Sequence, residues 1–186
     1  MFNKIYLFFA RIISDNIPFV RKMRYEVRRQ VGSSQRILEV GCALGGSLSV
    51  LRAKDRLLIG VDNDIKKIKI AQSMFRDIQF SVMDANSLGF PNDAFDVVIF
   101  SFTLHEIDDY VSVIGEACRV SRKVIITDMG EPRGVGGLFF RMIESEKLRR
   151  HIARDYDGEF SKYGFVKIFS GNISKNVFLK VYSKSD

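Results

Sequence analysis

Short apolar runs alternate with amphipathic stretches through the middle of this chain, and this alternation limits the possible folds more than any other feature. Each run is short, apolar and rich in β-branched residues, as expected of a strand buried on both faces of a sheet. The runs are Arg36–Val40, Leu57–Val61, Ile78–Val82, Phe95–Phe100 and Lys123–Thr127. Strands separated by helices form right-handed βαβ units. The pattern therefore predicts an α/β fold, a doubly wound, mostly parallel sheet with helices on both faces.

The stretches between these runs have helical periodicity. Asp64–Phe75 and Asp108–Val120 each carry one apolar stripe, and Ser47–Lys54 is a third helical stretch. The stripe of the first contains Ile65, Ile68, Ala71, Met74 and Phe75. After the fifth run, Met129–Gly137 is typical of a loop, and Leu138–Arg150 of another helix.

The two ends of the chain differ from this middle. Near the N-terminus, Asn16 and Pro18 suit a helix cap and a first-turn proline. The helix that follows has an apolar stripe of Val20, Met23, Val27 and Val31, with Arg21, Arg24 and Arg28 on another face. At the C-terminus, Val166–Phe169 and Val177–Tyr182 alternate with a two-residue period around Ser170–Asn176, which contains Gly171–Asn172. This pattern predicts an antiparallel hairpin at the end of the sheet.

Composition excludes several classes of protein. The chain has 186 residues, 46% of them apolar and 27% charged, which is the balance of a soluble globular domain. Two cysteines are too few for a disulfide framework, and with only two histidines beside them we expect no dedicated metal centre. The early apolar run Ile5–Ala10 is too short for a membrane span or a signal peptide. Reduced thiols fit a cytoplasmic protein.

The segment Ile37–Ser47 carries the strongest functional signal. A buried strand enters a turn that contains Gly41, Gly45 and Gly46, and a helix follows. Glycines there allow a sharp turn and close approach of a ligand to the backbone, and the helix N-terminus presents free N–H groups. Asp62 follows Gly41 by 21 positions and lies at the tip of the second strand. A carboxylate there can accept hydrogen bonds from both hydroxyls of a ribose. The pair predicts a cofactor that contains a nucleoside.

A dinucleotide fingerprint would need glycine at position 43, where this chain has Ala43. With Ile37, Leu38 and Glu39 ahead of it, the loop instead resembles motif I of the class I S-adenosylmethionine-dependent methyltransferases. Ala43 replaces the middle glycine of that motif.

The resemblance continues in order along residues 36–128. Gly60–Asp62 is similar to motif II, and Met83–Ala85 to the acidic position after the third strand. Leu88–Asp96 and Phe100–His105 are similar to the family's entry into and exit from strand four. Arg119–Val120 resembles the segment before strand five, although Ser121–Arg122 replaces the usual Lys-Pro-Gly-Gly turn.

The resemblance implies a Rossmann-like seven-stranded sheet and a set of cofactor contacts. Glu39, Gly41 and Gly45 would shape the methionine end, together with the main chain of Ser101. Asp62 would hold the ribose, and Asp84 the adenine amino group beside the backbone of Ala85. The predicted cofactor-binding set is Glu39, Gly41, Cys42, Ala43, Gly45, Asp62, Asn63, Asp84, Ala85 and Ser101, with no metal.

Each of these residues also has an ordinary structural interpretation. Asp62 could cap the helix that follows it, and Asp84 could be a loop acid. His105 is the candidate catalytic base, and the alternative is a histidine that merely begins the next helix. Cys42 and Cys118 suit small apolar fillers. Phe139, Phe140, Tyr156 and Phe160 suit either core packing or an apolar acceptor pocket.

The chain is thus interpreted as a single methyltransferase domain over 1–186. It comprises an N-terminal helical cap (1–35), a cofactor-binding core (36–128), an acceptor-side segment (129–160) and a terminal β-hairpin (161–186). The expected function is methyl transfer from S-adenosylmethionine, with S-adenosylhomocysteine as product, to a small apolar or ring-bearing acceptor. The resemblance is to the type that includes ubiquinone/menaquinone C-methyltransferases.

Two other functions remain open, namely RNA methylation and a non-catalytic partner subunit with this fold. Net charge is +7, and the basic N-terminal helix could contact RNA, a membrane surface or a second copy in a homodimer.

Overall fold

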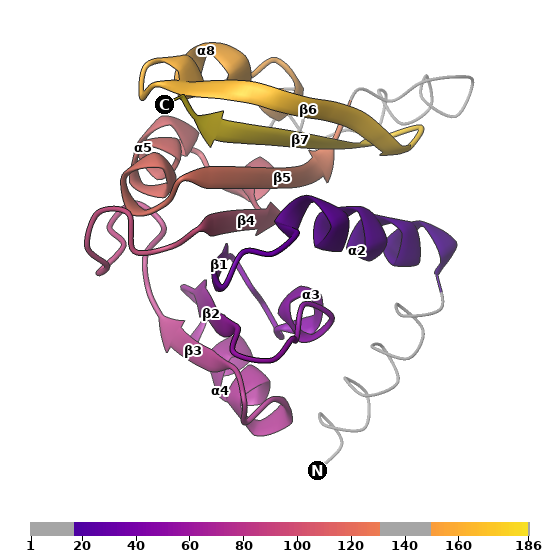
Figure 1. Cartoon of the computed structure of the whole chain (residues 1–186), viewed down its shortest axis with the longest axis vertical. Helices are drawn as coiled ribbons and strands as arrows, with labels where there is room; N and C mark the ends of the chain where they lie inside the picture. The colour runs from indigo at the N-terminus through magenta and orange to yellow at the C-terminus, as the bar shows by residue number, and fades with distance from the viewer. Residues whose placement is uncertain (1–16, 131–149, 186) are drawn as a thin grey trace.

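The structure is a computed structural model that describes residues 17–130 and 150–185 (Figure 1). Its strands are β1 (Arg36–Val40), β2 (Leu57–Asp62), β3 (Gln79–Val82), β4 (Val97–Ser101), β5 (Lys123–Met129), β6 (Phe165–Ser174) and β7 (Val177–Lys184). Its helices are α2 (Pro18–Val31), α3 (Gly46–Ser49), α4 (Ile65–Met74), the 3₁₀ turn η1 (Leu104–Glu106), α5 (Tyr110–Val120) and α8 (Tyr156–Ser161).

The strands form one seven-stranded sheet in the order β3-β2-β1-β4-β5-β7-β6. The first five strands are parallel, and β7 runs antiparallel between β5 and β6. The predicted mostly parallel sheet with a terminal antiparallel hairpin is confirmed. The strand order reverses between β1 and β4, and open α/β sheets bind ligands outside the carboxyl ends of the strands at such a point.

Helices cover both faces of the sheet, and each face has its own apolar core. One core contains side chains of α2, α3 and α4, such as Val27, Leu48 and Ile68. The other contains side chains of α5 and α8, such as Ile114 and Phe160. Figure 1 shows α2 and α5 on opposite sides of the sheet. Burial on both faces explains why the central strands are continuous apolar runs.

The helix after the glycine loop is much shorter than predicted. It spans Gly46–Ser49 instead of Ser47–Lys54. The chain leaves it in a turn in which the Leu51 amide donates to the Leu48 carbonyl, and the Arg56 guanidinium then binds the Leu51 carbonyl at 2.8 Å. This side-chain contact replaces the hydrogen bonds that a longer helix would have made.

Two details of α4 also differ from expectation. Its N-cap is Asp64, whose carboxylate accepts from the Lys66 and Lys67 amides, so the suggestion that Asp62 caps this helix is wrong. The periodicity predicts Ile65 on the buried stripe, but it is 53% exposed, and the buried side chains of α4 are Ile68 and Ala71.

Strand boundaries shift where side chains override the local pattern. β4 begins at Val97, whereas Phe95 makes an isolated bridge to Ser121 and packs edge-on against Phe90. In the hairpin, β6 continues to Ser174, and Gly171 and Asn172 pair with β7 instead of forming the turn.

The N-terminal helix begins with Pro18 in its first turn, as predicted, after Ile17 as N-cap. The suggested cap Asn16 lies outside the described residues. So do nearly all of the predicted loop Met129–Gly137 and helix Leu138–Arg150, with Phe139 and Phe140.

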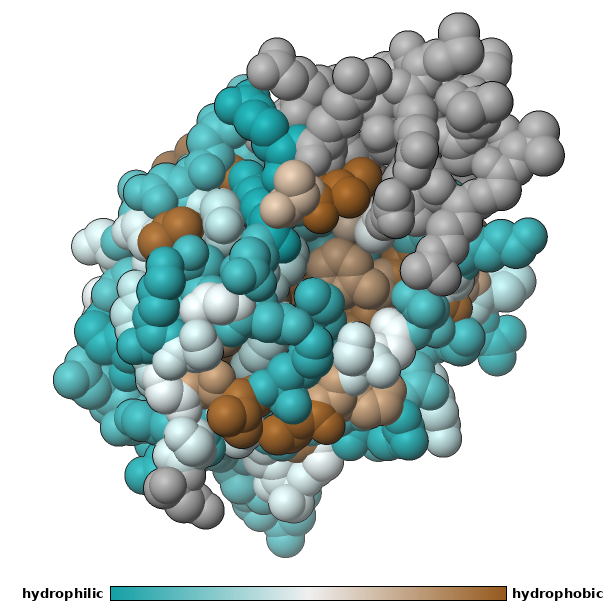
Figure 2. All heavy atoms as spheres, turned by 90° about the horizontal axis from the view of Figure 1, so that it is seen from above, coloured by the Kyte–Doolittle hydropathy of each residue, from teal (hydrophilic) through white to brown (hydrophobic). Residues whose placement is uncertain are grey.

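In the described part of the chain, no helix is both long and apolar enough to cross a membrane. Viewed from the β6 side, the surface is largely hydrophilic with separate apolar patches (Figure 2). Val166 and Ile168 on the edge strand β6 are among the exposed apolar side chains, and Lys167 lies between them. A charged residue on an edge strand opposes pairing with another sheet.

Candidate functional site

The loop after β1 is tied to the end of β2 by its own backbone. The amides of Gly41 and Cys42 both donate to the Val61 carbonyl, at 2.8 and 3.0 Å. Gly41, Ala43 and Gly45 have φ angles of 71°, 46° and 75°, which lie in the left-handed region that favours glycine. The loop is therefore a tight, irregular turn that directs its backbone toward the carboxyl end of the sheet.

Glycine is required at two of these positions for space as well as for conformation. A Cβ on Gly41 would lie 2.2 Å from the Thr103 side chain, and a Cβ on Gly45 would lie 2.5 Å from the Phe80 ring. Gly45 is also the N-cap of α3. Gly45 therefore faces the core, and its role is to let the loop turn close to the Phe80 ring.

Asp62 joins the loop to the start of α4. It is buried, and its two carboxylate oxygens accept from the Ala43 and Asp64 amides, each at 2.9 Å. An ionised carboxylate has about four acceptor positions, so each oxygen keeps one for another donor. Asp62 thus orders the loop, and its carboxylate can still accept hydrogen bonds from the hydroxyl groups of a ligand.

A cavity of about 590 Å³ lies over the carboxyl ends of β1, β2, β3 and β4. Of the predicted cofactor residues, those that line it are Gly41, Ala43, Asp62, Asn63, Asp84, Ala85 and Ser101. The structure therefore brings together residues spread over 60 positions of sequence, although their role in binding remains a prediction. Glu39, Cys42 and Gly45 do not line the cavity and lie behind it.

Asp84 stands on the exposed rim of this cavity. One of its oxygens accepts from the backbone amide and side-chain amide of Asn86, both at 2.9 Å, and these hydrogen bonds lower the pKa of Asp84. Its second oxygen accepts no hydrogen bond from any residue in the described ranges. Asp84 is therefore ionised at neutral pH, with one oxygen available to an amino group.

Glu39 is a buried carboxyl group at the back of the site. Burial raises the pKa of Glu39 to about 8, and the nearby hydroxyls of Ser101 and Ser47 and the charge of Arg24 oppose this only in part. Glu39 Oε2 and Ser101 Oγ are both buried without a well-formed hydrogen bond to the described part of the protein. Such atoms cost free energy unless another donor or a cation satisfies them.

Sequence reasoning missed other residues that line the cavity, among them Lys67, Asn86, Thr103, Glu106, Asp108 and Asp109. Most of them follow β3 or β4 directly, so position after a strand was an available signal. Lys67 lies within α4, and no local pattern marks it.

Both cysteines are buried free thiols whose pKa values burial raises, to about 12 for Cys118. Cys42 Sγ fills the space beside Gly60. These surroundings agree with the interpretation of both as apolar fillers.

His105 lies in η1 and does not begin α5, which starts at Tyr110 after Asp109 as N-cap. Its Nδ1 is 2.7 Å from Asp128 Oδ1, its backbone amide donates to Asp128 Oδ2, and its Nε2 is 3.1 Å from Glu106 Oε1. The hydrogen bond to Asp128 raises the pKa of His105, Glu106 adds to this effect, and burial opposes it.

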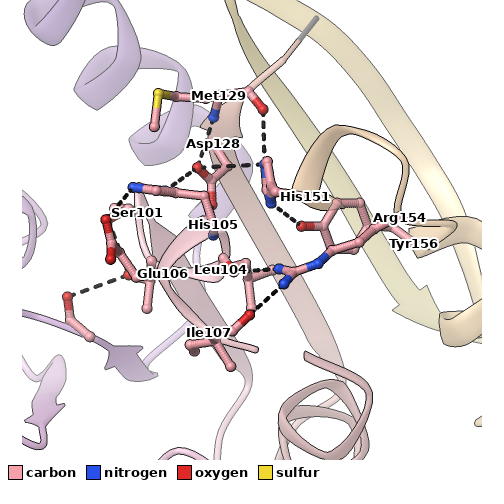
Figure 3. A network of polar contacts seen from close by, with 12 residues as sticks. Ser101, Leu104, His105, Glu106, Ile107, Asp128, Met129, His151, Arg154 and Tyr156 are labelled. Atoms are coloured by element: carbon pink, nitrogen blue, oxygen red, sulfur yellow. Dashed lines mark hydrogen bonds and ion pairs between the residues drawn. The ribbon is translucent and has the colours of Figure 1, made fainter. Parts of the chain in front are cut away.

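A second histidine lies on the other side of Asp128 (Figure 3). His151 Nε2 is 2.9 Å from the Met129 carbonyl, and its Nδ1 is 3.0 Å from Tyr156 Oη. A carbonyl only accepts, so Nε2 carries the hydrogen and Nδ1 accepts from the tyrosine. Burial lowers the pKa of His151, although Asp128 opposes this, so His151 is neutral.

The predicted acceptor pocket is not formed by Tyr156 and Phe160. Tyr156 is 3% exposed and Phe160 is fully buried, with its ring stacked on Tyr182. Both side chains belong to the core on the α5 face of the sheet. Their apolar character therefore reflects packing.

The basic face of α2 is divided in the structure. Arg21 and Arg28 are exposed, as expected of a solvated face. Arg24 is half-buried, and its guanidinium approaches Gly46 and the carboxyl of Glu39. Arg24 thus faces the glycine loop, whereas contact of this helix with RNA, a membrane or a second copy remains a prediction.

Comparison with known proteins gives related results by sequence and by structure. Residues 38–124 match a family described as a methyltransferase domain. Demethylmenaquinone methyltransferase of Renibacterium salmoninarum is 27% identical over 137 residues, which cover 71% of this chain and 56% of that protein. Its counterpart from Thermus thermophilus is 27% identical over 142 residues, covering 71% and 64%. The chain therefore spans less than two thirds of the length of these relatives.

Among solved structures, magnesium protoporphyrin IX methyltransferase (ChlM) of Synechocystis, with bound SAH, has a TM-score of 0.75 at 17% identity. The alignment covers 90% of this chain and 84% of that one. At this identity the likeness establishes the shared fold.

Proposed function

We propose that this chain, whose residues 38–124 form a class I S-adenosylmethionine-dependent methyltransferase domain, transfers the methyl group of S-adenosylmethionine to a small acceptor. The observation that carries this proposal is the cavity over β1–β4, where the left-handed glycine loop and Asp62 meet. The fold alone would not be enough, because one fold hosts many functions.

The residues present fit this cofactor. Asp62 keeps two acceptor positions for the ribose hydroxyls, and Asp84 keeps one oxygen for the adenine amino group. At the loop end of the site, Ser101 lines the cavity and Glu39 lies behind it, and Glu39 Oε2 and Ser101 Oγ are buried polar atoms that a methionine ammonium would satisfy. When bound, the cofactor supplies an electrophilic methyl group on a sulfonium.

The residues of this chain contribute binding and orientation. Asp62 and the Ala43 amide fix the loop against β2, so that the nucleoside end is held in one position. Positioning a nucleophile in line with a bound electrophile supplies much of the rate of such a transfer. Behind Gly45, the loop packs against the rings of Phe75 and Phe80.

For the acceptor, we propose a small apolar or ring-bearing molecule. The similarity to demethylmenaquinone methyltransferases supports this assignment. The walls of the cavity include Val40, Met83, Phe102 and Ile107, which are apolar. A second cavity of about 270 Å³ shares Asp108 with the first and leaves further room on this side. The free thiols fit action in the cytoplasm.

Calorimetric titration with S-adenosylhomocysteine, with NAD as control, tests the proposal. We expect a micromolar dissociation constant, which corresponds to about 8 kcal/mol, and no binding of NAD. Asp62→Ala should weaken binding at least tenfold, because it removes the ribose acceptors and releases the Ala43 amide. Absence of binding by the unaltered protein would refute the proposal. An unchanged affinity in Asp62→Ala would refute the ribose assignment.

Glu39 provides a sharper version of the same titration. Its raised pKa means that it is mostly protonated at pH 7, whereas a bound ammonium favours the carboxylate. Binding should therefore release close to one proton, measured as a dependence of the binding enthalpy on the ionisation enthalpy of the buffer. In Glu39→Gln this dependence should disappear.

A further inference from the structure

We propose that the outer face of α2 is a docking surface for an anionic lipid bilayer. The outer face is formed by five exposed side chains, those of Arg21, Lys22, Tyr25, Arg28 and Arg29. The inference goes beyond the proposed methyl transfer, and the docking surface can be tested in the absence of any cofactor.

Helical spacing brings these five side chains together. Arg21 and Lys22 precede Tyr25 by four and three positions, and Arg28 and Arg29 follow it by three and four. Residues three and four positions apart are neighbours on the surface of a helix, so four cations surround one aromatic ring. Tyr25 is 66% exposed, whereas the apolar stripe of α2 is buried on the other side of the helix.

The cations of the outer face greatly outnumber the acidic residues of the helix. Glu26 is the one acidic residue of α2, and it pairs with Arg29 at 2.8 Å. Arg21, Lys22 and Arg28 form no ion pair with any residue in the described ranges. Three positive charges are therefore available to a partner.

Interactions within the protein explain only part of this charge. Arg28 and Arg29 lie in the last turn of α2, where cations interact favourably with the helix dipole. Arg21 lies in the first turn, where the dipole favours acidic residues and α2 has none. Backbone carbonyls hold Arg56 near Arg28, and burial together with the charge of Arg28 lowers the pKa of Arg56. A cation at the unfavourable end of a helix and two like charges held together both indicate a negatively charged partner.

Apolar side chains at the N-terminal end of α2 favour a bilayer as this partner. Ile17 and Phe19 are both exposed, close in sequence to the first cations of the outer face. A bilayer surface binds cations at its anionic headgroups and accommodates apolar and aromatic side chains at the boundary with the acyl chains. A cluster of arginines and lysines beside exposed aromatic rings matches both requirements.

The shape and the charge of the outer face disfavour RNA and a second copy of the chain. Neither of the two cavities described above is lined by a residue of α2, so the outer face is the convex surface of a helix. Proteins that bind single-stranded RNA usually hold it in a positively charged groove. In a symmetric dimer built on this face, the cations of the two helices would repel one another.

Phe19 connects this end of α2 to the cavity. Its ring lies edge-on to the ring of Phe102, with 6.4 Å between the centroids, and Phe102 lines the cavity. Docking of α2 would therefore bring the cavity to the bilayer surface, where an apolar acceptor is concentrated. This consequence rests on the proposed function, whereas the docking surface does not.

Co-sedimentation with lipid vesicles tests the docking surface. Vesicles of equal parts of phosphatidylglycerol and phosphatidylcholine should bind the unaltered protein, and added salt should weaken this binding. The combined variant Arg21→Gln, Lys22→Gln and Arg28→Gln should lose about 100-fold in affinity, because each cation near an anionic membrane contributes about fivefold. No binding to the mixed vesicles, or equal binding to vesicles of phosphatidylcholine alone, would overturn the proposal.

The combined variant Lys66→Gln, Lys69→Gln and Arg76→Gln is the matched control. These exposed cations lie on and just after α4, and their removal lowers the net charge by the same amount. We expect a loss of less than about fivefold, and an equal loss in the two variants would mean that net charge, and not α2, attracts the vesicles. Circular dichroism should show that both variants fold. Failure of the unaltered protein to bind S-adenosylhomocysteine would refute methyl transfer, and the vesicle measurements would still decide the docking.

A fluorescent reporter locates the contact. The chain has no tryptophan, so Tyr25→Trp places a single indole at the centre of the outer face. Its emission should shift to shorter wavelength when the mixed vesicles are added. Sedimentation with vesicles but without this shift would show that another face binds them, which contradicts the proposal. Tighter binding to a single-stranded RNA oligonucleotide than to the mixed vesicles, or the same shift on dimerisation without vesicles, would replace it by one of the two alternatives.

Discussion

Two regions at the carboxyl ends of the strands, the proposed donor side and the proposed acceptor side, are built in different ways. On the donor side, after β1, β2 and β3, backbone amides and nearby carboxylates fix the loops, as in the contact of Ala43 with Asp62. On the acceptor side, after β4 and β5, side chains from distant segments meet around Asp128, and His151 is 46 positions away from His105 in sequence. A site built from backbone depends on conformation, whereas a site built from side chains depends on protonation.

The largest effect should come from the backbone of the donor side. Gly45→Ala places a Cβ 2.5 Å from Phe80 Cζ at a φ of 75°. Left-handed strain and overpacking together should lower the free energy of unfolding by about 3 to 5 kcal/mol. Urea denaturation measures this loss. Gly89→Ala is the matched control, since its Cβ would meet only Met83 at 3.7 Å, and a similar loss there would contradict the argument.

The next effect is a pH dependence that arises behind the donor side. The pKa of Glu39 is raised to about 8 in the folded state, so between about pH 4.5 and pH 8 the folded protein binds more protons than the unfolded chain. Stability contributed by this group is therefore full at low pH and is lost as pH rises. The expected loss is about 2 kcal/mol between pH 6 and pH 7.5.

Comparison of the unaltered protein with Glu39→Gln isolates that contribution, because the other titrating groups are common to both. Denaturation at several pH values should show the difference in slope. Parallel stability curves would mean that Glu39 is ionised in the folded protein without its ligand.

A smaller effect is expected on the acceptor side. Tyr156→Phe removes the hydroxyl that donates to His151 Nδ1 and leaves a buried acceptor unsatisfied. This should cost about 1 to 2 kcal/mol in the free energy of unfolding. Tyr25→Phe is the control, because Tyr25 is 66% exposed, and its change should stay within about 0.5 kcal/mol. Equal changes in the free energy of unfolding at the two positions would contradict a stabilising hydrogen bond between Tyr156 and His151.

The smallest effect returns to the glycine loop. Ala43→Gly relieves a left-handed φ of 46° but increases the entropy of the unfolded chain. The two changes nearly cancel, and the expected gain is about 0.5 kcal/mol. Affinity for S-adenosylhomocysteine should be unchanged, because the Ala43 amide already reaches Asp62. A large increase in affinity would show that the methyl group obstructs the site.

The two sides also differ in how far the sequence could predict them. The core strands and the meeting of Gly41 and Asp62 followed from the sequence pattern and spacing, because βαβ units bring successive strand ends to one edge, and Asp84 followed from the family resemblance. The length of α3 did not, since Arg56 ends that helix from outside it. Asp128 stood after an apolar run as a visible signal, but its pairing with His105 is a tertiary contact that no local periodicity encodes.

The two buried thiols report on two different parts of the molecule. Cys42 lies in the loop after β1, whereas Cys118 lies near the end of α5, which leads to the start of β5, and both are almost inaccessible with raised pKa values. A thiol reagent can modify each one only when its surroundings open, so the rate of labelling reports the free energy of local opening. A ligand that binds the loop should slow the labelling of Cys42 more than that of Cys118. Labelling of the two native thiols therefore measures local opening at two places in the molecule, and no new cysteine has to be introduced.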